Sequence, residues 1–141
     1  MSETHLSSSS DSPWSDVSRN WMGLLLFQGA IVFYLFYEDH SYWPHLLELW
    51  VVSSLAWGVC NEKPGERLKP GERLWFATLL LGWAILVLLF KITAYFSADE
   101  TSAAADHAAH LVHAIHFIVH FVILDTAWKG YQLARAERGT A

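Results

Sequence analysis

Four long apolar runs dominate the chain, and they restrict its fold more than any other feature. They cover residues 21–37, 44–60, 74–96 and 106–128. A helix needs roughly 20 residues to cross about 30 Å of hydrocarbon. Open strands would leave backbone groups unpaired in lipid, so helices are the available solution. The sequence therefore predicts an all-α integral membrane protein, a four-transmembrane-helix antiparallel bundle.

The composition agrees with this fold, because 53% of the 141 residues are hydrophobic and 15% are aromatic. These fractions are high for a small soluble domain. Residues 1–19 predict a disordered polar tail, residues 20–130 the transmembrane domain, and residues 131–141 a short cytoplasmic tail. Hairpin loops are expected near residues 38–44, 61–73 and 97–106.

The basic residues predict an orientation. Eight of the nine fall on one side of the expected membrane: Arg19, Lys63, Arg67, Lys69, Arg73, Lys129, Arg135 and Arg138. The opposite loops carry acidic residues instead: Glu38, Asp39, Asp99, Glu100 and Asp106. Cytoplasmic loops are enriched in Lys and Arg. We therefore expect a multi-pass protein of the plasma membrane or the bacterial inner membrane, with both termini in the cytoplasm.

The second loop contains a tandem hexapeptide, in which residues 63–68 (KPGERL) are followed by residues 69–74 (KPGERL). Each Pro-Gly pair favours a turn, and the basic side chains can lie against anionic headgroups. Two interpretations are open. The repeat is a local duplication that lengthened a loop, or it is a docking element for a partner.

Histidines are concentrated in the fourth apolar run, which contains His107, His110, His113, His116 and His120. At about 100° per residue, four of the five share a sector of roughly 120° with Asp106. Imidazole in lipid requires partners, so this sector should face the bundle interior. Lys91 is expected near the depth of His113 and Glu48, where it would form an ion pair with Glu48. Gln28 or Ser54 is expected to form a hydrogen bond with His120.

The histidines and acids predict a binding site near the outer face. Neutral imidazole is a common ligand of haem iron, copper and zinc, and carboxylates can complete such a site. The candidate cofactor ligands are His45, His110 and His113, and a metal site would add Glu48 and Asp106. His116 and His120 are secondary candidates, because no second histidine is expected at their depth. Haem b or a transition metal (copper, zinc or iron) would fit this set of ligands.

Two other interpretations of the histidines stay open. Imidazoles one helical turn apart can relay protons or metal ions across a membrane. Alternatively, they only join helices through hydrogen bonds in a structural accessory subunit. Trp43, Trp50 and Trp57, which recur every seven residues, could face a flat ring, pack ordinarily or contact a larger partner.

The sequence lacks a Gly-rich phosphate loop, a nucleophile elbow and an HExxH pattern, so no catalytic motif indicates an enzyme. No basic patch outside the membrane flank suggests nucleic-acid binding. We expect a small membrane subunit of a larger redox or energy-converting complex, for example in electron transport. Its partners would be the bilayer and that complex, or further copies of itself. A transporter and a structural subunit are the alternatives.

Overall fold

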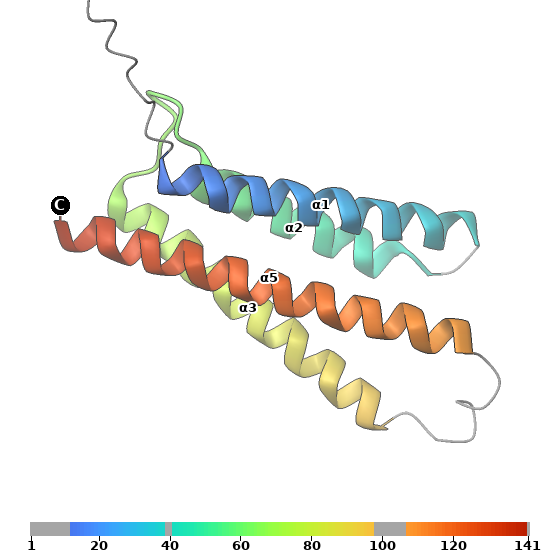
Figure 1. The fold of residues 1–141 in the computed structure, drawn as a ribbon. Helices are drawn as coiled ribbons and strands as arrows, with labels where there is room; N and C mark the ends of the chain where they lie inside the picture. Colours follow the sequence, from blue (N-terminus) through green and yellow to red (C-terminus); the bar gives the residue numbers. More distant parts are fainter. Residues whose placement is uncertain (1–11, 39–40, 98–106, 141) are drawn as a thin grey trace, which may run out of the picture.

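The computed structural model describes residues 12–38, 41–97 and 107–140, without the side chains of residues 94, 95, 97 and 107–113. Within these residues it contains four helices: α1 (Pro13–Tyr37), α2 (Trp43–Cys60), α3 (Pro70–Ser97) and α5 (His107–Thr140). Each helix runs opposite to the preceding one (Figure 1). The prediction of an all-α fold is confirmed.

Two helices in the described part of the chain are long and apolar enough to cross a membrane, which suggests membrane association. They are α1 and the stretch of α3 between Pro70 and Thr93. α2, with 18 residues, is the shortest of the four helices, and the side chains of the first turns of α5 lie outside the described residues. Each of the four predicted spans corresponds to a described helix, and two of these helices qualify as membrane spans, so crossing by all four stays a prediction.

The helices form a ring in which each one packs against two neighbours. α1 contacts α2 and α5, while α3 contacts α2 and α5, with the most extensive packing between α3 and α5. All four lie close together at the end where α5 finishes, and α3 diverges from α5 toward the other end (Figure 1). The helix axes are thus close together at one end, which we call the closed end of the bundle, and farther apart at the other, which we call the open end (Figure 1).

The core consists of buried side chains spaced three or four residues apart on each helix. This spacing keeps them on one helical face. They include Trp14, Val17 and Trp21 on α1, Val52, Ala56 and Val59 on α2, Ala77, Leu80 and Ala84 on α3, and Ile123, Ala127 and Ala134 on α5. The alanines are small enough to let the helices approach closely.

Two helices extend into the segments predicted as tails. α1 begins at Pro13, within the predicted tail of residues 1–19, where Ser12 Oγ accepts a hydrogen bond from the Trp14 backbone N–H at 3.3 Å. Proline suits the first helical turn because its missing N–H would be unpaired there anyway. α5 continues to Thr140, through the predicted cytoplasmic tail. Both extensions pack against the bundle through single side chains, since Trp14 and Ala134 belong to the core.

The two copies of the hexapeptide take different structures. The first forms a turn in which Gly65 has a φ of +85°, a conformation that favours glycine. The second copy begins α3 at Pro70, and the Lys69 backbone N–H donates to Glu72 Oε2 at 3.1 Å. This bond is half of a capping box. A turn at each Pro-Gly pair was expected, and this is wrong for the second pair, so the loop ends at Lys69 and not at residue 73.

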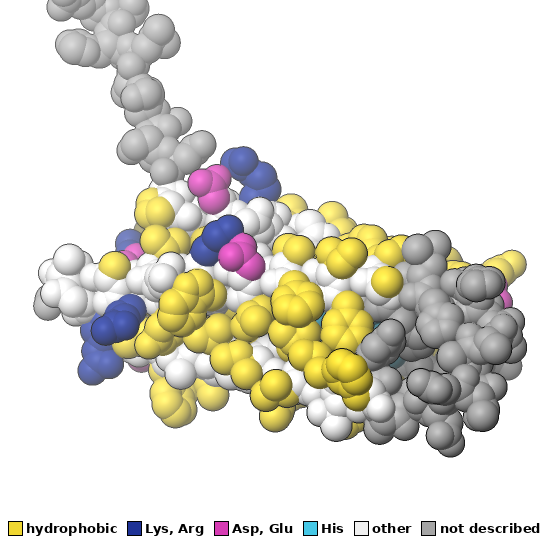
Figure 2. All heavy atoms as spheres, turned by 60° about the horizontal axis from the view of Figure 1, so that its bottom comes forward, with side chains coloured by type: hydrophobic (Ala, Val, Ile, Leu, Met, Phe, Trp, Pro, Cys, Tyr) yellow, Lys and Arg dark blue, Asp and Glu magenta, His cyan; other side chains and the backbone are white. Residues whose placement is uncertain are grey.

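The outer surface of the helices is largely apolar. Figure 2 shows hydrophobic side chains over the visible face, with charged side chains gathered mainly toward the end where α5 finishes. Trp43, Trp50 and Trp57 are 67%, 67% and 65% exposed, so this stripe of α2 points away from the core. Trp43 and Trp50 therefore do not form an inner wall for a ring-shaped cofactor, whereas Trp57 borders a hollow between α1 and α2.

Candidate functional site

The buried faces of the helices change from apolar to polar toward the open end of the bundle. On α2 the face of Val52 and Ala56 continues to Glu48 and His45, while on α3 the face of Ala84 and Leu88 continues to Lys91. On α5 it continues from Ile123 to His120 and His116, and α1 contributes Gln28, which is 7% exposed. We call His45, Glu48, Lys91, His116 and His120 the polar cluster.

His120 is the most buried member of the polar cluster, at 1% exposure. Its Nδ1 lies 2.8 Å from the His116 carbonyl oxygen, and its Nε2 lies 3.3 Å from Glu48 Oε1. A carbonyl can only accept, so Nδ1 carries a hydrogen and donates it. The bond to Glu48 then requires a second proton, either on Nε2 or on the carboxyl group. His120 and Glu48 therefore share one proton.

Lys91 and His116 form the other half of the polar cluster. Lys91 Nζ lies 3.0 Å from Nε2 and 3.1 Å from Nδ1 of His116. An ammonium group can only donate, so the ring nitrogen that receives its bond carries no hydrogen. The His116 ring also packs against His45, with centroids 5.6 Å apart, and against His120, at 4.7 Å. The polar cluster thus joins α2, α3 and α5.

The structure changes several of the pairings expected from the sequence. Lys91 contacts His116 in place of the expected Glu48, and Glu48 contacts His120. The expected hydrogen bond between Ser54 and His120 is replaced by one within α2, in which the Ser54 hydroxyl donates to the Trp50 carbonyl at 2.8 Å.

His116 was expected to lack a second histidine at its depth, and this is wrong because His45 packs against it. The predicted partners of His45, His110 and His113, lie one to two turns earlier on the same helix. The offset between α2 and α5 therefore differs from the predicted one by about one turn. His116 and His120, expected to be secondary, are central members of the polar cluster.

Part of the predicted binding site lies outside the described residues. Asp106 precedes the described start of α5, and the side chains of His107, His110 and His113 are likewise not described. Among the residues whose side chains are described, no three His, Cys, Asp or Glu converge in a way that could hold a metal ion. A metal site that adds Asp106, His110 and His113 to His45 and Glu48 stays a prediction.

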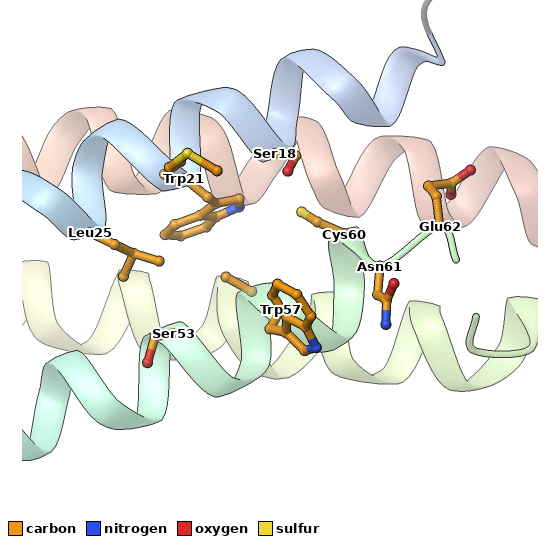
Figure 3. A pocket seen from close by; sticks show the side chains of 10 residues that line it. Ser18, Trp21, Leu25, Ser53, Trp57, Cys60, Asn61 and Glu62 are labelled. Carbon is orange, nitrogen blue, oxygen red and sulfur yellow. The ribbon is translucent and has the colours of Figure 1, made fainter. Parts of the chain in front are cut away.

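A separate hollow of about 280 Å³ lies between α1 and α2, and no sequence pattern indicated it. The side chains of Trp21, Leu25 and Trp57 make much of its wall, with Cys60 nearby (Figure 3). Its polar lining residues are Ser18, Ser53, Asn61 and Glu62. No residue of the polar cluster lines it, so the hollow and the polar cluster are distinct features.

Comparisons of the chain with protein-family models, with curated proteins and with solved structures gave no match. A four-helix arrangement by itself carries no functional information. Any functional conclusion therefore depends on the chemistry of the polar cluster.

Proposed function

We propose that this protein is a small integral-membrane subunit of a larger energy-converting complex, and that its polar cluster takes up and releases protons on one side of the membrane. All four helices cross the plasma or bacterial inner membrane, with both termini in the cytoplasm. The observation that carries this proposal is the contact of His120 Nε2 with Glu48 Oε1, 3.3 Å apart inside the bundle, while His120 Nδ1 lies 2.8 Å from the His116 carbonyl oxygen.

The hydrogen-bonding chemistry of the polar cluster supports proton exchange. Moving the shared proton from His120 Nε2 to Glu48 Oε1 converts an ion pair into a neutral pair. Burial disfavours the two charges, while their mutual attraction offsets part of that cost. His116 links this pair to Lys91, which is a second proton donor.

The described interior outside the polar cluster supports proton exchange with only one side of the membrane. Between the polar cluster and the closed end of the bundle, the buried side chains are mainly apolar: Val52, Ala56, Leu80, Ala84, Ile123 and Ala127. The buried Thr126 hydroxyl donates to the Val122 carbonyl of its own helix at 2.8 Å. The described side chains therefore offer no continuous polar path across the bundle, which disfavours a transporter.

The exposed tryptophan stripe supports a role as a subunit. Trp50 lies in the middle of α2 and points outward, at 67% exposure. An indole N–H in the hydrocarbon would lack a hydrogen-bond partner, whereas tryptophans usually sit at the membrane interfaces. A neighbouring protein could supply that partner.

Infrared difference spectroscopy of the purified protein during a pH change tests the proposal. We expect a carbonyl band of a protonated carboxyl group that changes with pH in the wild type and is absent from Glu48→Gln. Glu38→Gln is the matched control, because Glu38 is an exposed carboxylate near the same end of the bundle. A Glu48→Gln spectrum identical to that of the wild type would refute the shared proton.

Vesicles that contain only this protein test the one-sided part of the proposal. We expect no steady proton flux across them, because the interior beyond the polar cluster is apolar. Sustained flux that is lost in Glu48→Gln would establish the transporter in place of the one-sided site.

A bound cofactor is the second candidate function, and the facing pair His45 and His116 favours it. These histidines come from different helices, and their ring centroids lie 5.6 Å apart, so one haem or metal ion could use both as ligands. An optical spectrum and elemental analysis decide it. A Soret band would indicate haem, and stoichiometric copper, zinc or iron would indicate a metal site. Either signal should be lost in His45→Ala.

A further inference from the structure

Arg73, from the second hexapeptide, is completely buried at the closed end of the bundle, far from the polar cluster. Its Nη1 donates to both oxygens of Glu137 on α5, at 2.9 and 3.0 Å. Its Nη2 donates to Glu62 Oε1 at 2.8 Å and to the Asn61 carbonyl at 3.0 Å. A buried guanidinium with several charged and polar partners connects α3 to the end of α2 and to α5.

Glu137 collects further donors from the rest of the bundle. The Trp14 indole N–H on α1 donates to Glu137 Oε1 at 2.8 Å, and Arg67 Nη2 donates to the same oxygen at 3.0 Å. The Arg73 guanidinium also lies 4.6 Å from the centroid of the Trp14 ring, in a cation–π contact. One carboxylate on α5 therefore binds α1, α3 and the loop between α2 and α3.

The two arginines that bind Glu137 occupy the same position of the repeated hexapeptide. Arg67 belongs to the first copy, a turn in which the backbone N–H groups of Glu66 and Arg67 donate to the Lys63 carbonyl. Arg73 belongs to the second copy, in the first turns of α3. The duplication thus brings one side chain to Glu137 from a loop and an identical one from a helix.

We infer that the tandem hexapeptide forms a two-arginine clamp: its two arginines bind Glu137 and hold the last turns of α5 against α1 and α3. Arg67, Arg73, Glu62, Glu137 and Trp14 are its members. Because Arg73 is buried, loss of the Glu137 charge would leave its guanidinium poorly compensated, which is strongly destabilising. The clamp explains the repeat without a membrane surface or a docking partner, and it does not depend on the proposed function.

Cys60 provides a reporter of the clamp, because it is the only cysteine and directly precedes Asn61 and Glu62. Glu137→Gln keeps the shape of the side chain and removes its charge. In the full-length protein we expect Cys60 to react with a maleimide about tenfold faster, because local opening exposes the thiol. We also expect the Tm to fall by about 10 °C. Arg135→Ala, an exposed arginine on the same helix, is the control and should match the wild type.

Arg67→Ala tests the first copy separately and stays informative if Glu137→Gln fails to accumulate. It leaves the buried pair of Arg73 and Glu137 intact, and Arg67 is about half exposed. We therefore expect only a moderate increase in the labelling rate, roughly threefold. A wild-type rate in Arg67→Ala would overturn the role of the first copy. A wild-type rate and Tm in Glu137→Gln, or an equal effect of Arg135→Ala, would overturn the clamp.

Discussion

His120 shows how a single buried side chain can define the chemistry of a site. One ring nitrogen is committed to the His116 carbonyl, so only the other can exchange a proton with Glu48. A histidine whose nitrogens both faced solvent would carry no such restriction. The sequence indicates that His120 faces inward, but neither of these two partners follows from its spacing on the helix.

Glycines at two positions should respond oppositely to alanine. Gly65 has a positive φ, so Gly65→Ala would be strained and should lower the free energy of unfolding by about 1 kcal/mol. Gly130 is helical, and an added Cβ would lie 3.7 Å from Val17 Cγ1, an ordinary contact distance. Gly130→Ala should therefore raise stability by about 1 kcal/mol through helix propensity. Thermal unfolding of the two variants measures both effects, and destabilisation by Gly130→Ala would contradict the packing of α1 against α5.

At the scale of the helices, the sequence was most informative where the signal is local. Long apolar runs and a helical period depend only on neighbouring residues, and they predicted four helices. The repeated hexapeptide marks the limit of this approach, because identical residues form a turn in one copy and a helix start in the other. The difference must come from their surroundings: the second copy leads directly into the apolar run of α3, and its arginine is buried in the clamp.

Equivalent glutamates in the two copies should contribute differently to stability. Glu72 accepts the Lys69 backbone N–H at the start of α3, at 3.1 Å. Glu72→Ala should lower the free energy of unfolding by about 1 kcal/mol, as the loss of a helix cap does. Glu66, its exposed counterpart, accepts from the Asn61 side chain at 3.1 Å, so Glu66→Ala should lower the free energy of unfolding by roughly half as much. Chemical denaturation compares the two, and equal losses would show that capping does not distinguish the copies.

At the scale of the whole molecule, the sequence predicted which side chains face inward but not which of them meet. His45, Glu48, His116 and His120 were all placed toward the interior. Their pairing depends on the offset between helices along the bundle axis, and helical periodicity carries no information about that offset. Packing at the closed end helps to set this offset. There Gly130 lies close to Val17 and Trp14, and Glu137 binds Arg73. These contacts join residues more than 60 positions apart in the chain, beyond the reach of local patterns.

Membrane topology tests the arrangement of the complete chain. If all four helices cross the membrane, an even number of spans places both termini on the same side, and the bias of Lys and Arg makes that side the cytoplasm. Reporter fusions after residue 141 and before residue 1 should therefore both be cytoplasmic, whereas a reporter inserted within residues 98–106 should be external. Among the described residues, α1 and α3 are long and apolar enough to qualify by themselves, so the topology test concerns α2 and α5. If only α1 and α3 crossed, the termini would still share a side, but α2 and α5 would lie at the membrane surface or outside it.

Labelling of Cys60 distinguishes these two topologies. With four spans, an impermeant maleimide added outside intact cells should not label Cys60, while the same reagent should label a cysteine introduced at residue 102. External labelling of Cys60 would contradict the four-span topology and the placement of the polar cluster toward the outer face.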